Sequence, residues 1–155
     1  MTPRKIKVRP RSSAMVGKQR EELIAFAKSR VVRAINSGFY LEAISLEESL
    51  IADRLESILS KRVSGELHLL TASQACSKLE QENIAGLDSE LLSRIRTWSD
   101  GRAEALHEFV KLHETNTKSW RTRLNFAREI AEKGLELIRE PDAMAKKLNR
   151  ELSAP

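Results

Sequence analysis

The sequence predicts an all-α fold, an up-and-down bundle of four main helices followed by a short C-terminal helix. Three observations favour this class. The good helix formers Leu, Ala, Glu, Lys and Arg dominate the chain, and only six glycines and four prolines interrupt it. Apolar residues recur at helical spacing over long stretches that short turn signals separate. A length of 155 residues suits one domain with a sizeable core.

The charge of the chain is distributed unevenly. Residues 1–20 contain seven Lys or Arg and no acid, whereas the remaining 20 bases are outnumbered by 22 acids. We therefore expect a flexible basic N-terminal arm over residues 1–16 and a single helical-bundle domain over residues 17–155. Such an arm can hold nucleic-acid phosphates through counterion release. The alternatives are a solvated tail without a dedicated partner and a short Ile6/Val8 strand docked on a neighbour.

Two long helices are expected in the first part of the domain. The first runs from Gly17 to Asn36, and its apolar face includes Leu23 and Phe26. Gly38 then suits a left-handed helix end. The second runs from Phe39 to Arg62, and its apolar residues cover more than one stripe, which predicts burial against two neighbours. Four charged residues interrupt this surface, and we interpret them as paired with nearby groups or as lying near the functional cleft. These are Glu47, Glu48, Asp53 and Arg54.

A third and a fourth helix follow. The third is expected from Glu66 to Asn83. Asp88 is a good N-cap for the fourth, because its carboxylate accepts hydrogen bonds from the first free amides. Since glycine costs roughly 1 kcal/mol inside a helix, Gly101 predicts a kink or a restart at Ser99/Asp100.

The last long helix is expected from Thr117 to Arg139, with caps offered by residues 115–117. Its arginines, including Arg123, are expected on the outer face. Pro141 can open another helix, and residues 141–152 are expected to form a short amphipathic one.

The strongest functional pattern is the pair Arg102 and His107, which four residues separate. Histidine can give or take a proton near neutral pH, and arginine can hold a phosphate through two parallel hydrogen bonds. Together they suit cleavage of a phosphodiester by its own 2′-hydroxyl, with His107 as general acid/base and Arg102 stabilising the charged phosphate. That scheme requires no metal. Asp100 and Lys111 are further candidate contacts to the substrate.

This segment resembles the signature of the HEPN family (higher eukaryotes and prokaryotes nucleotide-binding domains), in which an arginine precedes a histidine by four to six residues near a helix start. The resemblance extends over the surrounding helices, within residues 21–140. It implies a small all-α domain and, as in many members, a ribonuclease with a toxin or defence role. Two positions depart from the pattern, Ala103 where a polar residue is common and Phe109 where a subset has tyrosine. Either can mean weaker catalysis or a binding-only descendant.

Helix geometry sets a condition on this site. Five residues along an ideal helix correspond to a net rotation of about 140° and a rise of about 7.5 Å, so Arg102 and His107 point different ways unless the helix begins or bends between them. A restart at Ser99/Asp100 would place Arg102 in a first turn, where the helix dipole favours an anion. A two-fold dimer offers another solution, because two copies of each residue can line a shared cleft. The resemblance implies such a homodimer.

Several other classes of function have little support. The single cysteine, Cys76, excludes an internal disulfide and a cysteine-cluster metal site. His107 and His113 are too far apart for a His-Glu-x-x-His zinc motif, so neither a metal nor a cofactor is expected. No stretch is long and apolar enough to span a membrane, which makes a cytoplasmic protein the default expectation.

Three hypotheses remain open. The first is a metal-independent endoribonuclease that acts on RNA as a homodimer, with an antitoxin or regulatory protein as a possible partner. The second is a catalytically inactive HEPN-like module that binds RNA, a nucleotide or a protein. In the third, an unrelated helical interaction protein, Arg102 is an ordinary exposed residue and His107 a hydrogen-bonded helix residue. A second arginine–histidine match, Arg62 and His68, crosses a helix break and is treated as a decoy.

Overall fold

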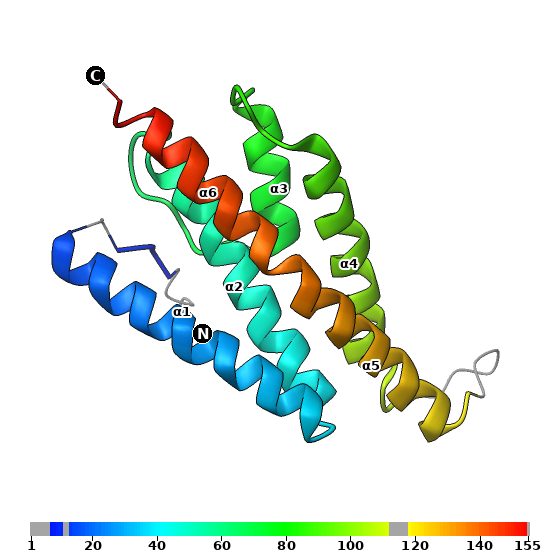
Figure 1. Cartoon of the computed structure of the whole chain (residues 1–155). Helices are drawn as coiled ribbons and strands as arrows, with labels where there is room; N and C mark the ends of the chain where they lie inside the picture. Colours follow the sequence, from blue (N-terminus) through cyan, green and yellow to red (C-terminus); the bar gives the residue numbers. More distant parts are fainter. Residues whose placement is uncertain (1–6, 11–12, 112–117, 155) are drawn as a thin grey trace, which may run out of the picture.

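Six helices form a bundle in the computed structural model, which describes residues 7–10, 13–111 and 118–154 (Figure 1). The predicted all-α fold is confirmed. Four of the helices are long and two are short, and each corresponds to one of the helical ranges expected from the sequence. The helices are α1 (Ala14–Asn36), α2 (Tyr40–Ser60), α3 (Ala72–Gln81), α4 (Ser89–Glu108), α5 (Trp120–Leu137) and α6 (Arg139–Glu151).

The second helix, α2, is the centre of the bundle and packs against all five other helices. Ile44, Ile51, Leu55 and Ile58 on this helix are fully buried. The sequence predicted only two neighbours for this helix. More helices pack on it because its apolar residues lie around most of its circumference and not along two stripes only. Burial of this kind contributes about 1.5–3 kcal/mol for each large aliphatic side chain.

Helix α1 begins at Ala14 because the Ser13 side chain accepts a hydrogen bond from the Val16 N–H, three residues before the expected start at Gly17. Gly38 follows it with φ +78°, as predicted. The apolar face was assigned correctly only in part. Leu23 and Phe26 are 68% and 70% exposed, whereas Ile24, Val31 and Ala34 are buried against the bundle.

The third helix starts six residues later than predicted. Residues 66–71 are not helical, and α3 begins at Ala72. Thr71 and Gln74 form a capping box, in which each side chain accepts a hydrogen bond from the other residue's backbone N–H. Before it, an isolated antiparallel bridge pairs His68 with Val8. The apolar residues within 66–71 therefore belong to the connection between α2 and α3 and not to a further helical turn.

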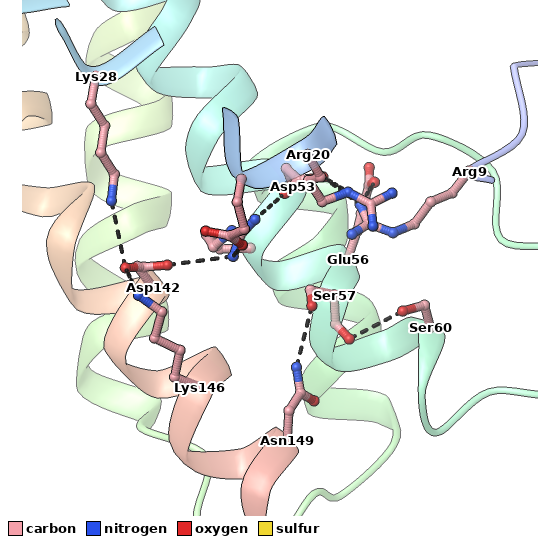
Figure 2. A network of polar contacts seen from close by, with 12 residues as sticks. Arg9, Arg20, Lys28, Asp53, Glu56, Ser57, Ser60, Asp142, Lys146 and Asn149 are labelled. Atoms are coloured by element: carbon pink, nitrogen blue, oxygen red, sulfur yellow. Dashed lines mark hydrogen bonds and ion pairs between the residues drawn. The ribbon is translucent and has the colours of Figure 1, made fainter. Parts of the chain in front are cut away.

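The described part of the N-terminal arm, Lys7–Pro10, lies along this connection. The Arg9 N–H donates to Leu67 O (2.8 Å), and the Leu69 N–H donates to Lys7 O (3.0 Å). Arg9 is only 7% exposed, and its Nη1 lies 2.8 Å from both Asp53 Oδ1 and Glu56 Oε2 of α2 (Figure 2). This residue of the arm is thus part of the packed structure rather than solvated.

Helices α5 and α6 form one bent helix, since Ile138 is both the C-cap of α5 and the N-cap of α6. Pro141 lies in the first turn of α6, as expected, where its missing N–H removes no helical hydrogen bond. The predicted caps at 115–117 lie outside the described residues. None of the described helices has the length and apolar character needed to cross a membrane.

Candidate functional site

The helix that carries the arginine–histidine motif, α4, runs without a break from Ser89 to Glu108. The predicted kink or restart at Ser99/Asp100 is therefore wrong, and Arg102 does not lie in a first turn. A β-carbon on Gly101 would lie 2.6 Å from Ile130 Cδ1 of α5. Glycine thus permits the close approach of two helices here and does not end one.

Arg102 faces α2 and is held there by Glu48. Its Nε lies 3.4 Å from Glu48 Oε2, and the other carboxylate oxygen accepts a 2.7 Å hydrogen bond from the Ala72 N–H. Because Ala72 is the first residue of α3, one carboxylate connects three helices. Its contact to Arg102 is an ion pair, since neither Arg102 Nε nor Glu48 Oε2 makes a hydrogen bond to a described residue. The terminal nitrogens of Arg102 have no hydrogen-bond partner among the described residues, and its side chain is 27% exposed. They are available to an anion.

His107 lies in the last turn of α4 and is exposed. Its ring has no hydrogen-bond partner within the described part of the chain. Because the helix is continuous, Arg102 and His107 are separated by a rotation of about 140° and a rise of about 7.5 Å. A single protomer therefore does not bring the two side chains together. Asp100 and Lys111 are also exposed, and neither has a side-chain contact to the pair.

Glu47, the residue before Glu48, lies in a very different environment. It is completely buried, and neither of its carboxylate oxygens has a hydrogen-bond partner. Its Oε2 and the Trp98 Nε1 lie 2.0 Å and 2.9 Å from the point where a β-carbon would stand on Gly134 of α5. Trp98 instead donates to Ile130 O (3.0 Å). Loss of hydration raises the pKa of Glu47 to about 8, so this carboxyl group is neutral at physiological pH.

Two hollows lie between α4 and α5, and neither is lined by Arg102 or His107. Trp98, Gly101 and Ile130 contribute to one of them. Ala105 and Phe109 contribute to the other. The motif residues therefore lie outside both hollows.

Arg123 fixes the end of α4 against the start of α5. It is 8% exposed, and its guanidinium donates to three backbone carbonyls, those of Lys118 (3.1 Å), Lys111 (2.6 Å) and Glu108. The expectation that it decorates the outer face was wrong. One local signal was missed, because Arg123 lies four and seven residues before Ala127 and Ile130 and so shares their buried helix face. Arg123 therefore positions the backbone beside His107.

No three His, Cys, Asp or Glu side chains among the described residues lie close enough to hold a metal ion. Cys76 is buried, and desolvation raises the pKa of its thiol to about 12. The thiolate form is thus disfavoured, as expected for a packed structural cysteine.

The fold and the site together define an all-α bundle with an oriented arginine and an exposed histidine on one helix. Comparison with known proteins gives no match to a family model, to a curated protein or to a solved structure.

Proposed function

We propose that this protein is a HEPN-like, metal-independent endoribonuclease that acts as a homodimer. The observation that carries the proposal is the arrangement on α4. Glu48 orients Arg102 while leaving its terminal nitrogens available, and His107 is exposed at the end of the same helix. An oriented guanidinium suits a phosphate, and an accessible imidazole suits proton transfer.

The reaction follows from these two groups. The imidazole of one His107 takes the proton of an RNA 2′-hydroxyl as its oxygen attacks the adjacent phosphorus. Arg102 stabilises the charge that develops on the phosphate oxygens. The same imidazole, now protonated, gives this proton to the departing 5′-oxygen. The products are a 2′,3′-cyclic phosphate and a 5′-hydroxyl.

Exposed apolar side chains support a dimer at this end of the molecule. Val110, just after α4, is 84% exposed, and Trp120, the first residue of α5, is 68% exposed. Arg121 stacks on the Trp120 ring at 5.6 Å from its centroid. Large apolar side chains gathered near a candidate site favour contact with another protein surface. A second copy placed there supplies the histidine that one protomer does not bring to its own arginine.

The first test is cleavage of total RNA in EDTA by the wild type, His107→Ala and His68→Ala. We expect fragments with 2′,3′-cyclic phosphate ends from the wild type and His68→Ala, and none from His107→Ala. His68 is the matched control because it is exposed and distant from the motif. Equal cleavage by all three proteins would exclude a role for His107. Growth inhibition on expression, relieved by His107→Ala, would add a toxin or defence role with an antitoxin or regulatory protein as partner.

A mixing experiment tests whether the site is shared. Arg102→Gln and His107→Ala are each expected to be inactive. After the two are mixed and allowed to exchange subunits, half of the dimers are heterodimers that contain one intact composite site. The mixture should recover about a quarter of the wild-type activity. No recovery despite confirmed heterodimers would place both residues in a site within one protomer.

A second candidate is a HEPN-like module that binds RNA, a nucleotide or a protein without cleaving. Two departures from the family pattern, Ala103 and Phe109, favour it, as does the exposed position of His107 away from both α4–α5 hollows. A dimer that binds RNA but leaves it intact, with the same affinity in His107→Ala, is the result expected for this candidate.

A further inference from the structure

Polar side chains of α2 and α6 line a shared hollow at the ends of these two helices. On α2 they are three, four or seven residues apart, and on α6 Lys146 lies three and four residues before Asn149 and Arg150, so each set lies on one side of its helix. Figure 2 shows Asn149 of α6 pointing toward Ser57 of α2. The volume of the hollow is about 480 Å³. The polar lining includes Arg54 and Ser57 of α2, its C-cap Lys61, and Lys146, Asn149 and Arg150 of α6.

The hydrogen bonds in this hollow leave one donor unused. Asn149 Nδ2 donates to Ser57 Oγ (3.2 Å), and Asn149 Oδ1 accepts from Arg62 Nη1 (3.2 Å). The amide is therefore fixed in orientation by a partner on each side. The Ser57 hydroxyl accepts one hydrogen bond, and no acceptor for its own proton lies among the described residues. That proton is available to a ligand.

The charge of the lining is positive. Four bases line the hollow together with one acid, Glu21. Arg54 is 6% exposed and is neutralised by carboxylates, and Lys146 lies 2.9 Å from Asp142 Oδ2. Lys61 and Arg150 have no ion-pair partner in the described part of the chain. Two unpaired bases thus flank the Ser57 hydroxyl, an arrangement that favours an anion.

The helix ends do not cancel this effect. Both α2 and α6 end near the hollow, and the free carbonyls of helix C-termini carry partial negative charge. Arg62 offsets them, because its Nη1 donates to Ile58 O (3.0 Å) and its Nη2 donates to Leu148 O (2.8 Å). These two contacts satisfy a carbonyl near each helix end.

We propose that this α2–α6 hollow binds a phosphate group, with Lys61 and Arg150 as the charged contacts and Ser57 as a hydroxyl donor. The site is separate from the proposed ribonuclease centre. Lys61 and Glu48 are thirteen residues apart on α2, which corresponds to about 20 Å along the helix. The same chemistry suits a free phosphate or nucleotide and a phosphate of the RNA backbone.

The direct test is calorimetric titration of the full chain with inorganic phosphate at low ionic strength. The test variant is the double substitution Lys61→Gln/Arg150→Gln. The matched control is Lys147→Gln/Arg33→Gln, which removes one lysine and one arginine from exposed positions outside the hollow. We expect about tenfold or weaker binding by the test variant, because two charge-assisted contacts are lost. The control should change the affinity less than about twofold. Ser57→Ala, which removes the unused donor without a charge change, should also weaken binding.

Two further titrations distinguish the sources of the phosphate. A nucleoside 5′-monophosphate and a single-stranded oligoribonucleotide replace inorganic phosphate, and His107→Ala is used so that the RNA stays intact. Tighter binding of the oligonucleotide, lost in the test variant, assigns the hollow to an RNA backbone. Equal affinities for the three probes assign it to a free phosphate group. Absence of phosphate binding by the wild type, or equal weakening in the test and control variants, overturns the proposal. These results do not depend on whether RNA is cleaved.

Discussion

Two adjacent acids in α2 show how environment decides the role of a residue. Glu48 has a backbone N–H and an arginine to stabilise its charge, whereas Glu47 is buried beside Trp98 and Gly134 without a hydrogen-bond partner. The sequence identified both as charged residues on an otherwise apolar helix. It did not distinguish them, because their partners come from α3, α4 and α5.

Glu47→Gln should make the free energy of unfolding less sensitive to a rise in pH between 4.5 and 8. In the folded wild type, Glu47 keeps its proton up to about pH 8, whereas in the unfolded chain it loses the proton near its ordinary pKa of 4.5. The free energy of unfolding therefore falls with rising pH by about 1.4 kcal/mol per pH unit within this window and then levels off. Relative to its value at pH 4.5, the stability of Glu47→Gln should exceed that of the wild type by on the order of 4 kcal/mol at pH 8.

Urea unfolding at several pH values between 4.5 and 8.5 measures this difference. The amide of the variant can add a pH-independent change in stability. Comparing how the free energy of unfolding of each protein changes with pH removes this contribution. A difference between the two proteins that does not change with pH would show that Glu47 is ionised in the folded state.

At the scale of the element, features that depend on the local sequence were predicted correctly, whereas features that depend on residues distant in the sequence were not. Asp88 caps α4 by accepting from the Leu91 N–H (2.9 Å), and Gly38 ends α1, both as predicted. The start of the third helix was wrong because residues 66–71 pair with an arm far away in sequence. The burial of Arg9 was missed for the same reason, since its acceptors are 44 and 47 residues away.

The candidate site was likewise predictable only in part. The rotation between Arg102 and His107 follows from helix geometry alone, once the helix is known to be continuous. Its continuity was not predictable, because the role of Gly101 depends on Ile130 in a helix that comes later in the chain. The orientation of Arg102 by Glu48 depends in the same way on how α2 and α4 pack.

Arg9→Ala should destabilise the protein by about 2–3 kcal/mol, because it leaves the buried Glu56 without its cation. The loss of stability stays moderate because other contacts of the two acids remain. Asp53 still forms ion pairs with Arg20 and Arg54, and Glu56 still accepts a hydrogen bond from the Leu70 N–H. Lys7→Ala, an exposed change in the same segment, should alter stability by less than about 0.5 kcal/mol. Thermal and urea unfolding of both variants provide the measurement. Similar losses in both would mean that Arg9 contributes only net charge.

At the scale of the whole molecule, two exposed apolar regions are candidates for the contact of the proposed homodimer. One contains Val110 and Trp120 near the motif, and the other contains Leu23 and Phe26 on α1. The ribonuclease proposal requires the first region, since only that contact brings a second His107 close.

Val110→Asp should therefore convert a dimer into a monomer and abolish RNA cleavage, whereas Phe26→Asp should leave both properties unchanged. A charge in a buried apolar contact costs several kcal/mol, enough to dissociate a moderate dimer. Light scattering gives the mass, and circular dichroism verifies that both variants fold. Dissociation by Phe26→Asp alone would place the two-fold axis on α1 and contradict the shared site.

The central position of α2 also has a consequence for synthesis of the protein. Its apolar surface is completed by α5 and α6, and Arg54 finds Asp142 only 88 residues later in the chain. A ribosome adds roughly 5–20 residues per second, so α2 waits several seconds for these covering helices. Throughout this interval the side of α2 that α5 and α6 later cover stays exposed on the nascent chain, where it can aggregate or bind a chaperone.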